Sequence, residues 1–223
     1  MRKIAVVAGA TGVTGSTLLR QLASDSRFDR VIALVRSARR GLPERVESLI
    51  VDFEALANSE GDATIAMNYA ATDQLVVFCC LGTTIKVAGS QAAFRRVDFD
   101  YVVAVARWAK AQHAVHFGLI SALGASAKSS VFYTRTKGEA EDAVRALALP
   151  SVHILRPSFI DGNRTESRPG ESVAIRFARG ISPLLLGPLR RYRVVAAEAI
   201  AASLLAASMS PVAGVTVTES EAI

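Results

Sequence analysis

The feature that most constrains the fold is a glycine-rich turn near the start of the chain. An apolar run at residues 4–8 is followed at once by Gly9-Ala10-Thr11-Gly12-Val13-Thr14-Gly15, and a helical pattern of apolar residues covers 13–23. Glycines spaced three apart let the chain turn sharply and let a helix pack closely on a strand. The chain is therefore expected to begin with a strand, a tight turn and a helix, the opening unit of an α/β sheet.

The same turn has the composition of a phosphate-binding loop. Gly9 allows the sharp turn, Gly12 lets the backbone approach a pyrophosphate, and Gly15 permits close packing of helix on strand. The helix that begins here offers free N–H groups and the positive end of its dipole. The turn predicts a bound dinucleotide, and the alternative that stays open is a tight turn without a ligand.

Short β-branched runs alternate with longer helical stretches along the chain. We expect strands at 4–8, 31–35, 49–52, 75–80, 115–121 and 152–156, and helices at 13–23, 91–112 and 133–147. This alternation is typical of βαβ units, and uninterrupted apolar runs such as Val76-Val77-Phe78 indicate strands buried on both faces. The predicted fold class is α/β, a doubly wound parallel (Rossmann) sheet.

The chain is predicted to form a single domain over residues 1–223. Its turn-rich end, about 157–223, is expected to be a small C-terminal lobe on the substrate side, with a helix near 198–208 and a last strand at 215–218. The apolar Leu184-Leu185-Leu186 is either a buried substrate lid or an exposed contact patch.

Composition excludes several classes of protein. Residues 1–3 run straight into the first strand without a signal-peptide apolar region, and the apolar run at 200–209 is far shorter than the roughly 20 residues of a membrane-spanning helix. The adjacent Cys79 and Cys80 would form a strained disulfide, and the three histidines lack metal-ligand spacing. We expect a cytoplasmic protein with no integral membrane contact and no metal.

The net charge of +6 would allow contact with anions, but the basic residues are scattered. The densest groups, Arg36-Ser37-Ala38-Arg39-Arg40 and Arg190-Arg191-Tyr192-Arg193, are short, and nucleic-acid binding needs clustering on one face. We therefore expect a small-molecule substrate and no nucleic acid.

The end of the second predicted strand bears on the choice of dinucleotide. NAD binders usually carry a carboxylate there, whereas this strand ends in Arg36 and Ser37. A guanidinium and a hydroxyl suit the 2′-phosphate of NADPH, and a solvated loop arginine is the alternative. Asp52 and Phe53 end the third predicted strand, where the carboxylate could accept the adenine amino group or cap the next helix.

Tyr133 and Lys137 form a Y-x-x-x-K pair on a predicted helix, which places both on one face. A fixed lysine charge beside a phenol makes the phenol a usable acid or base, and the lysine could also hold the nicotinamide ribose. Ser121 ends the fifth predicted strand, at the sheet edge where α/β proteins bind ligands. Ser121, Tyr133 and Lys137 are the predicted catalytic residues, and a purely structural Ser121 and Tyr133 is the alternative.

With these residues the chain resembles the short-chain dehydrogenase/reductase superfamily in its atypical NAD(P)-binding branch. Within that branch it looks like the Tat-interacting-protein family of small NADPH-binding proteins and their bacterial relatives. Besides the glycine turn, the resemblance rests on Cys79-Cys80-Leu81-Gly82-Thr83-Thr84, Val97-Asp98-Phe99-Asp100-Tyr101, Phe132-Tyr133-Thr134-Arg135-Thr136-Lys137-Gly138-Glu139, Leu155-Arg156-Pro157 and Glu166-Ser167-Arg168-Pro169-Gly170.

The resemblance implies a cofactor site. The residues implied to hold the pyrophosphate are Gly9, Thr11, Gly12, Val13 and Thr14, and those implied to hold the 2′-phosphate are Arg36 and Ser37. It also implies that Leu81 and Gly82 lie along the cofactor, that Tyr133 donates the proton, that Lys137 orients the ribose, and that Ile160 and Arg168 approach the nicotinamide. One departure concerns Ser121, because related reductases often have a second small hydroxyl residue where this chain has Ala122.

Two functions follow as hypotheses. The first is an NADPH-dependent oxidoreductase that reduces a small carbonyl compound. The second is an NADPH-binding regulatory or redox-sensing protein without turnover, since the resembling family includes members better known as regulators. A homodimer through residues 91–112 and 133–147, or a protein partner, is compatible with both.

Overall fold

One parallel sheet forms the centre of the molecule. The computed structural model describes residues 2–38, 41–59, 65, 67–161, 185 and 187–223. The strands of the sheet run in the spatial order β3-β2-β1-β4-β5-β6-β9, and each neighbouring pair is parallel. In chain order they are β1 (Lys3–Ala8), β2 (Arg30–Val35), β3 (Val46–Ile50), β4 (Gln74–Cys79), β5 (His116–Ile120), β6 (Ser151–Arg156) and β9 (Gly214–Glu219). The predicted doubly wound parallel sheet is confirmed.

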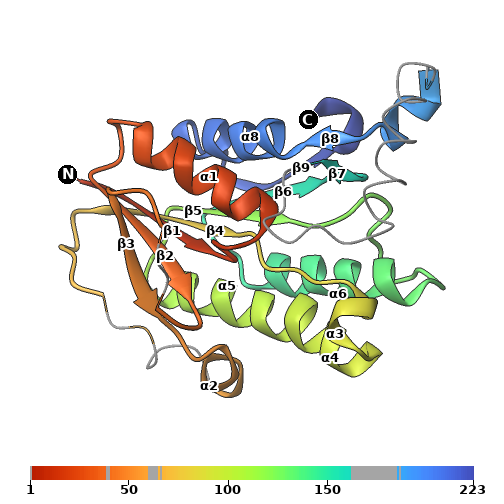
Figure 1. Ribbon diagram of the computed structural model, residues 1–223, viewed down its shortest axis with the longest axis horizontal. Helices are drawn as coiled ribbons and strands as arrows, with labels where there is room; N and C mark the ends of the chain where they lie inside the picture. The colour runs from red at the N-terminus through yellow and green to blue at the C-terminus, as the bar shows by residue number, and fades with distance from the viewer. Residues whose placement is uncertain (1, 39–40, 60–64, 66, 162–184, 186) are drawn as a thin grey trace.

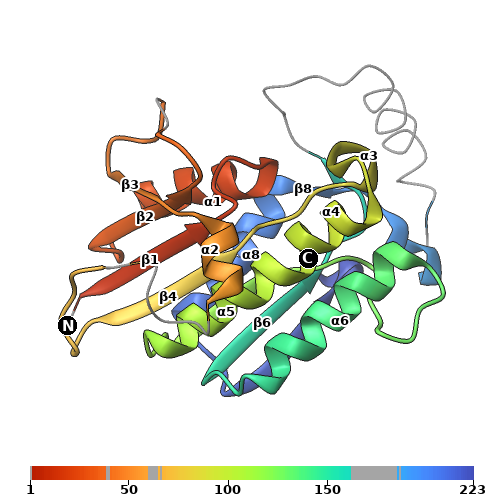
Figure 2. The same cartoon turned by 90° about the horizontal axis from the view of Figure 1, so that it is seen from below.

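Helices cover both faces of the sheet (Figures 1 and 2). On one face α1 (Val13–Ser24) and α8 (Ala197–Met209) lie side by side. On the other face lie α2 (Phe53–Asn58), α5 (Tyr101–Ala111) and α6 (Phe132–Ala146), and the short α3 (Ile85–Ala88) and α4 (Gln91–Arg95) follow β4. The strand order reverses between β1 and β4, and ligands of such sheets bind at the carboxyl ends of the strands beside that reversal.

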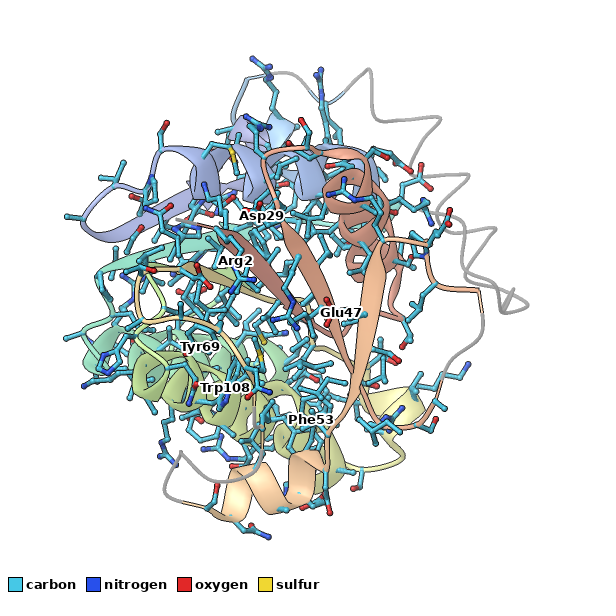
Figure 3. All side chains as sticks on the ribbon, turned by 90° about the vertical axis from the view of Figure 1, so that its left-hand side faces the viewer. Arg2, Asp29, Glu47, Phe53, Tyr69 and Trp108 are labelled. Carbon is cyan, nitrogen blue, oxygen red and sulfur yellow. The ribbon has the colours of Figure 1, made fainter. Side chains whose placement is uncertain are left out.

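Each face of the sheet has its own apolar core. On the α1 side, Leu18, Phe28 and Leu204 are fully buried together with the inward side chains of β1, β2 and β4. On the α5 side the core includes Trp108 and Phe53, and Figure 3 shows both on that side of the sheet with Tyr69. Uninterrupted burial along β1, β2 and β4 explains why their sequences are apolar at successive positions.

The helix and the strand expected in the small C-terminal lobe join the main layers. β9 pairs with β6 from Ser151↔Gly214 to Arg156↔Glu219, and α8 packs beside α1, so both elements complete the main layers. The physical reason is that Ile200 and Leu204 of α8 cover apolar surface of the sheet that α1 leaves open.

Within the described residues, the C-terminal elements outside the main layers are two short strands and two 3-10 turns. They are β7 (Ile160–Asp161) paired with β8 (Val195–Ala196), η3 (Gly187–Tyr192) and η4 (Ser220–Ala222). Outside the described residues lie Arg39, Arg40, Leu184, Leu186 and the segment 166–170.

Two other elements differ in their bounds. β3 spans Val46–Ile50 rather than 49–52, because Asp52 already caps α2. The expected helix at 91–112 is divided into α4, a π-helical turn η1 (Arg96–Asp100) and α5. This turn places a charged residue in the core, as described below.

Within the described ranges, no helix has both the length and the apolar character needed to cross a bilayer. In the same ranges, no group of three or more His, Cys, Asp or Glu could hold a metal ion. Cys79 and Cys80 are not bonded to one another. Burial raises the pKa of the Cys79 thiol to about 12, so this side chain is a protonated packing group.

Candidate cofactor and active site

The glycine turn lies at the reversal of strand order and leaves no room for other side chains. Gly9 has a φ of +77°, and a Cβ there would lie 2.4 Å from the carbonyl oxygen of Cys80, which follows β4. A Cβ on Gly15 would lie 2.2 Å from the carbonyl oxygen of Gly9. The turn, the first helix and the loop after β4 therefore meet in backbone contact, which requires glycine at both positions.

The first turn of α1 fits an anion. Gly12 caps the helix without a side-chain hydrogen bond to the first-turn amides, and its own N–H donates to the Gly9 carbonyl at 3.0 Å. Thr11 and Gly12 are exposed, Val13 is half-buried, and Thr14 is buried. Because this 12-residue helix presents its positive end to the sheet edge, its backbone suits the pyrophosphate of a dinucleotide.

The end of β2 is free to meet a phosphorylated ribose. Arg36 and Ser37 directly follow β2 and are exposed. Within the part of the chain that the structure describes, the ion pairs do not include Arg36. The guanidinium is thus available to a ligand at this edge.

Asp52 and Phe53 have structural roles. The Asp52 carboxylate accepts hydrogen bonds from the backbone N–H groups of Glu54 at 2.9 Å and Ala55 at 3.1 Å, so it caps α2, the alternative considered from the sequence. Phe53 is buried with its ring centre 5.7 Å from that of Tyr101. An adenine contact by these two residues stays a prediction.

Helix α6 carries Tyr133 and Lys137 and is packed tightly onto the preceding loop. A Cβ on Gly138 would lie 2.1 Å from the carbonyl carbon of Ser126, and the N–H of Ser126 donates to the Thr134 carbonyl at 3.1 Å. Tyr133 is half-buried, with its ring centre 5.4 Å from that of Phe94. The glycine and this loop contact fix the face of α6 that holds the tyrosine and the lysine.

Lys137 has a buried acidic partner that the sequence did not single out as a site residue. Its Nζ lies 2.7 Å from Oδ1 of Asp98, and both side chains are almost completely buried. Oδ2 of Asp98 accepts a hydrogen bond from the backbone N–H of Thr83 at 2.9 Å. Burial by itself lowers the pKa of Lys137, but Asp98 and Tyr133 more than offset it, so the pKa lies above its ordinary value.

The loop after β4 borders this ion pair. A Cβ on the exposed Gly82 would lie 3.4 Å from Oδ1 of Asp98 and 3.5 Å from Nζ of Lys137. Leu81 packs against the α5-side core. A side chain at position 82 would therefore lie in van der Waals contact with the ion pair, whereas glycine lets a ligand along the loop approach it.

Ser121 follows β5 and offers an unused hydroxyl. It is buried, and its Oγ has no hydrogen-bond partner among the residues of the described ranges. Its backbone N–H donates to the Leu155 carbonyl at 2.7 Å, which holds the residue at the carboxyl edge of the sheet. A buried hydroxyl without a partner is costly unless a ligand or water completes it, which fits a substrate contact.

Of the two residues expected near the nicotinamide, the structure describes one. Ile160 lies on β7, half-buried and paired with Val195. Arg168 lies outside the described residues.

The arrangement has the parts needed for reduction of a carbonyl group or oxidation of an alcohol. One sheet edge carries an amide-lined turn for phosphates, a half-buried phenol, a buried ammonium and an unpaired hydroxyl. Such groups can hold a dinucleotide and move a proton, while the cofactor provides the hydride.

Comparison with known proteins identifies relatives of this chain. A family model described as NAD(P)H-binding matches residues 9–176. Protein HTATIP2 of Rattus norvegicus is 38% identical over 178 residues, which cover 78% of this chain and 70% of that protein. The mitochondrial protein fmp52 of Aspergillus clavatus is 31% identical over 215 residues, which cover 96% of this chain and 90% of that protein.

Solved structures agree on the fold. MoeE5 in complex with UDP-glucuronic acid and NAD matches with a TM-score of 0.67 and 18% identity, over 97% of this chain and 75% of that one. A UDP-glucose 4-epimerase of Thermotoga maritima with UDP-glucose has a TM-score of 0.67 and 14% identity, over 97% and 76% of the two chains. The chain therefore belongs to the NAD(P)H-binding Rossmann family that includes HTATIP2 and the FMP52 proteins.

Proposed function

We propose that this protein is an NADPH-dependent oxidoreductase that reduces a small carbonyl compound. The observation that carries the proposal is the placement of Tyr133 on α6 one helical turn before the buried, charged Lys137, beside a loop that a glycine keeps open. A half-buried phenol next to a fixed cation is suited to proton transfer.

Each residue then has a defined role, and Lys137 has two. NADPH, when bound at the glycine turn and Arg36, would supply hydride to the carbonyl carbon. The Tyr133 hydroxyl donates its proton to the carbonyl oxygen, and the Lys137 charge stabilises the phenolate that remains. The Ser121 hydroxyl donates a hydrogen bond to the same oxygen, and Lys137 holds the nicotinamide ribose. The product alcohol leaves, and the phenolate takes up a proton from water.

The preference for NADPH over NADH rests on the end of β2. A guanidinium free of the described carboxylates can pair with the 2′-phosphate, and Ser37 beside it can donate a hydrogen bond. An NAD site would place a carboxylate here, and a carboxylate would repel the phosphate.

The test is a panel of small aldehydes, ketones and quinones, with turnover followed by the loss of NADPH absorbance. Tyr133→Phe is expected to abolish turnover of any substrate found while NADPH binding is kept. The matched control is Tyr69→Phe, because the Tyr69 hydroxyl bonds to the Gln112 carbonyl at 3.0 Å, away from the site. Turnover by Tyr133→Phe equal to that of the unmodified protein would contradict the proposed chemistry.

The regulatory alternative differs from the oxidoreductase in the expected result of the substrate panel. A regulator would bind NADPH tightly, yet no compound of the panel would be consumed faster than by Tyr133→Phe. A homodimer or protein partner and a cytoplasmic location stay predictions, and several fungal relatives carry the word mitochondrial in their names.

A further inference from the structure

The acidic partner of Lys137 lies in an unusual place. Asp98 belongs to the π-helical turn η1 (Arg96–Asp100), and its side chain is fully buried. The same turn carries Asp100, which is partly exposed and whose Oδ2 lies 3.3 Å from Nη1 of Arg96. π-helical turns are rare and often occur at functional sites. The turn thus has one acid in the interior and one at the surface.

Asp98 joins three elements around the proposed nicotinamide end of the site. Oδ1 contacts the Lys137 ammonium on α6, and Oδ2 accepts the Thr83 N–H in the loop after β4. Gly82, the neighbour of Thr83, is the residue whose missing side chain leaves this ion pair open. The carboxylate therefore sets the distance between the lysine and the loop.

Three groups from three elements raise the pKa of Lys137. They are Asp98 on η1, the Tyr133 phenol on α6 and the Cys79 thiol on β4. The pKa of the Cys79 thiol is raised to about 12 by burial, so this group is neutral. Among the described groups that act on Lys137, Asp98 is the one that forms an ion pair with it.

We propose that Asp98 is a positioning residue of this site, which keeps the buried Lys137 ammonium charged and fixed beside the loop after β4. The role toward the nicotinamide ribose rests on the proposed function, whereas the effect on Lys137 itself does not. Without the carboxylate, burial dominates and favours the neutral amine, because a buried ammonium that lacks a partner loses its hydration without compensation.

The first experiment follows the titration of Lys137 in the cofactor-free protein by NMR of lysine side chains, with Lys137→Arg to assign the signal. In Asp98→Asn the pKa of Lys137 is expected to fall below the 10.5 of a free lysine, whereas in the unmodified protein it lies above that value. Asp100→Asn is the matched control, because it removes a carboxylate from the same turn that does not contact Lys137. The same pKa of Lys137 in Asp98→Asn and in the unmodified protein would overturn the proposal.

The second experiment measures the affinity for NADPH at about pH 7 and about pH 9.5. Asp98→Asn is expected to weaken binding more at the higher pH, where a larger fraction of its lysine is neutral than in the unmodified protein and no longer holds the ribose by its charge. A purely structural defect would weaken binding equally at both pH values, and that result would contradict the proposal. If the unmodified protein binds no NADPH, the proposed function fails, while the titration of Lys137 still decides the role of Asp98.

A double variant covers the case in which Asp98→Asn does not fold. Asp98→Asn with Lys137→Gln removes both charges and keeps similar volumes. Recovery of the native circular-dichroism spectrum by the double variant supports the proposal, because the unpaired ammonium then caused the defect. Failure of the double variant to fold would assign Asp98 to packing and overturn the proposal.

Discussion

Replacement of His116 should make the protein less sensitive to acid. His116 lies on β5, almost completely buried, with Nδ1 2.9 Å from Oγ of Ser151. Its Nε2 has no partner within the described part of the chain. Burial, together with the neighbouring His153 and Lys3, lowers the pKa of His116 from the ordinary 6.5 to about 4. The folded protein therefore holds this ring in its neutral form.

The sign of the effect follows from which state takes up the proton first. As the pH falls below about 6.5 the unfolded chain protonates His116, while the folded protein does not, so the free energy of unfolding decreases. The gap between 6.5 and about 4 corresponds to about 3 kcal/mol in full, of which about 2 kcal/mol is lost between about pH 7.5 and pH 5. Most carboxylates remain ionised in that window, so histidines account for the change. Burial also lowers the pKa of His153, whose contribution is present in both the variant and the unmodified protein.

The assay is urea unfolding at about pH 7.5 and about pH 5, followed by circular dichroism and by the fluorescence of the buried Trp108. In His116→Asn the loss of unfolding free energy between the two pH values should be smaller by about 2 kcal/mol than in the unmodified protein. The amide can keep the bond to Ser151, and any packing cost is the same at both pH values. His113→Asn, at an exposed histidine with a φ of 55°, should behave like the unmodified protein. Equal acid losses in His116→Asn and the unmodified protein would refute the reasoning.

Two further variants test the backbone turn and the anchoring of α6. Gly15→Ala should keep the α/β circular-dichroism spectrum but weaken NADPH binding by about tenfold or more in calorimetry. The reason is that its Cβ would lie 2.2 Å from the Gly9 carbonyl oxygen, so the turn must shift. Unchanged affinity for NADPH would contradict this prediction. Glu141→Gln should lower the unfolding free energy by about 3 kcal/mol in urea, because the buried Glu141 accepts two hydrogen bonds from Arg156, at 2.9 and 2.6 Å. The exposed neighbour Asp142→Asn should cost under about 1 kcal/mol, and equal losses in the two variants would refute the role of burial.

Local chemistry explains which parts of the fold could be predicted. β1 and β4 were predictable because strands buried on both faces are apolar at successive positions, and the glycine turn because its backbone tolerates no side chain. The place of β9 was not predictable in the same way. It alternates valine and threonine at the edge of the sheet, and its partner β6 is far away in the chain.

The site shows the same limit. Tyr133 and Lys137 were predicted from their spacing on one helix, whereas Asp98 was missed because its partner lies on another helix. A signal was present, since Asp98 is four residues from Phe94 and four from Val102, both buried. An acid on the apolar face of a helix needs a buried partner, and Lys137 is that partner. The π-helical turn that accommodates it has no sequence signature known to us.

The most direct test of the account is calorimetric titration of the protein with NADPH and with NADH. NADPH should bind more tightly by about ten- to hundredfold, because a guanidinium–phosphate contact contributes about 1.5–3 kcal/mol. Arg36→Ala should remove most of that difference, whereas Arg107→Ala, an exposed arginine on α5, should leave it unchanged. Equal affinity for the two cofactors, or a preference for NADPH that survives Arg36→Ala, would contradict the assignment of Arg36, and no binding of either would contradict the proposed site as a whole.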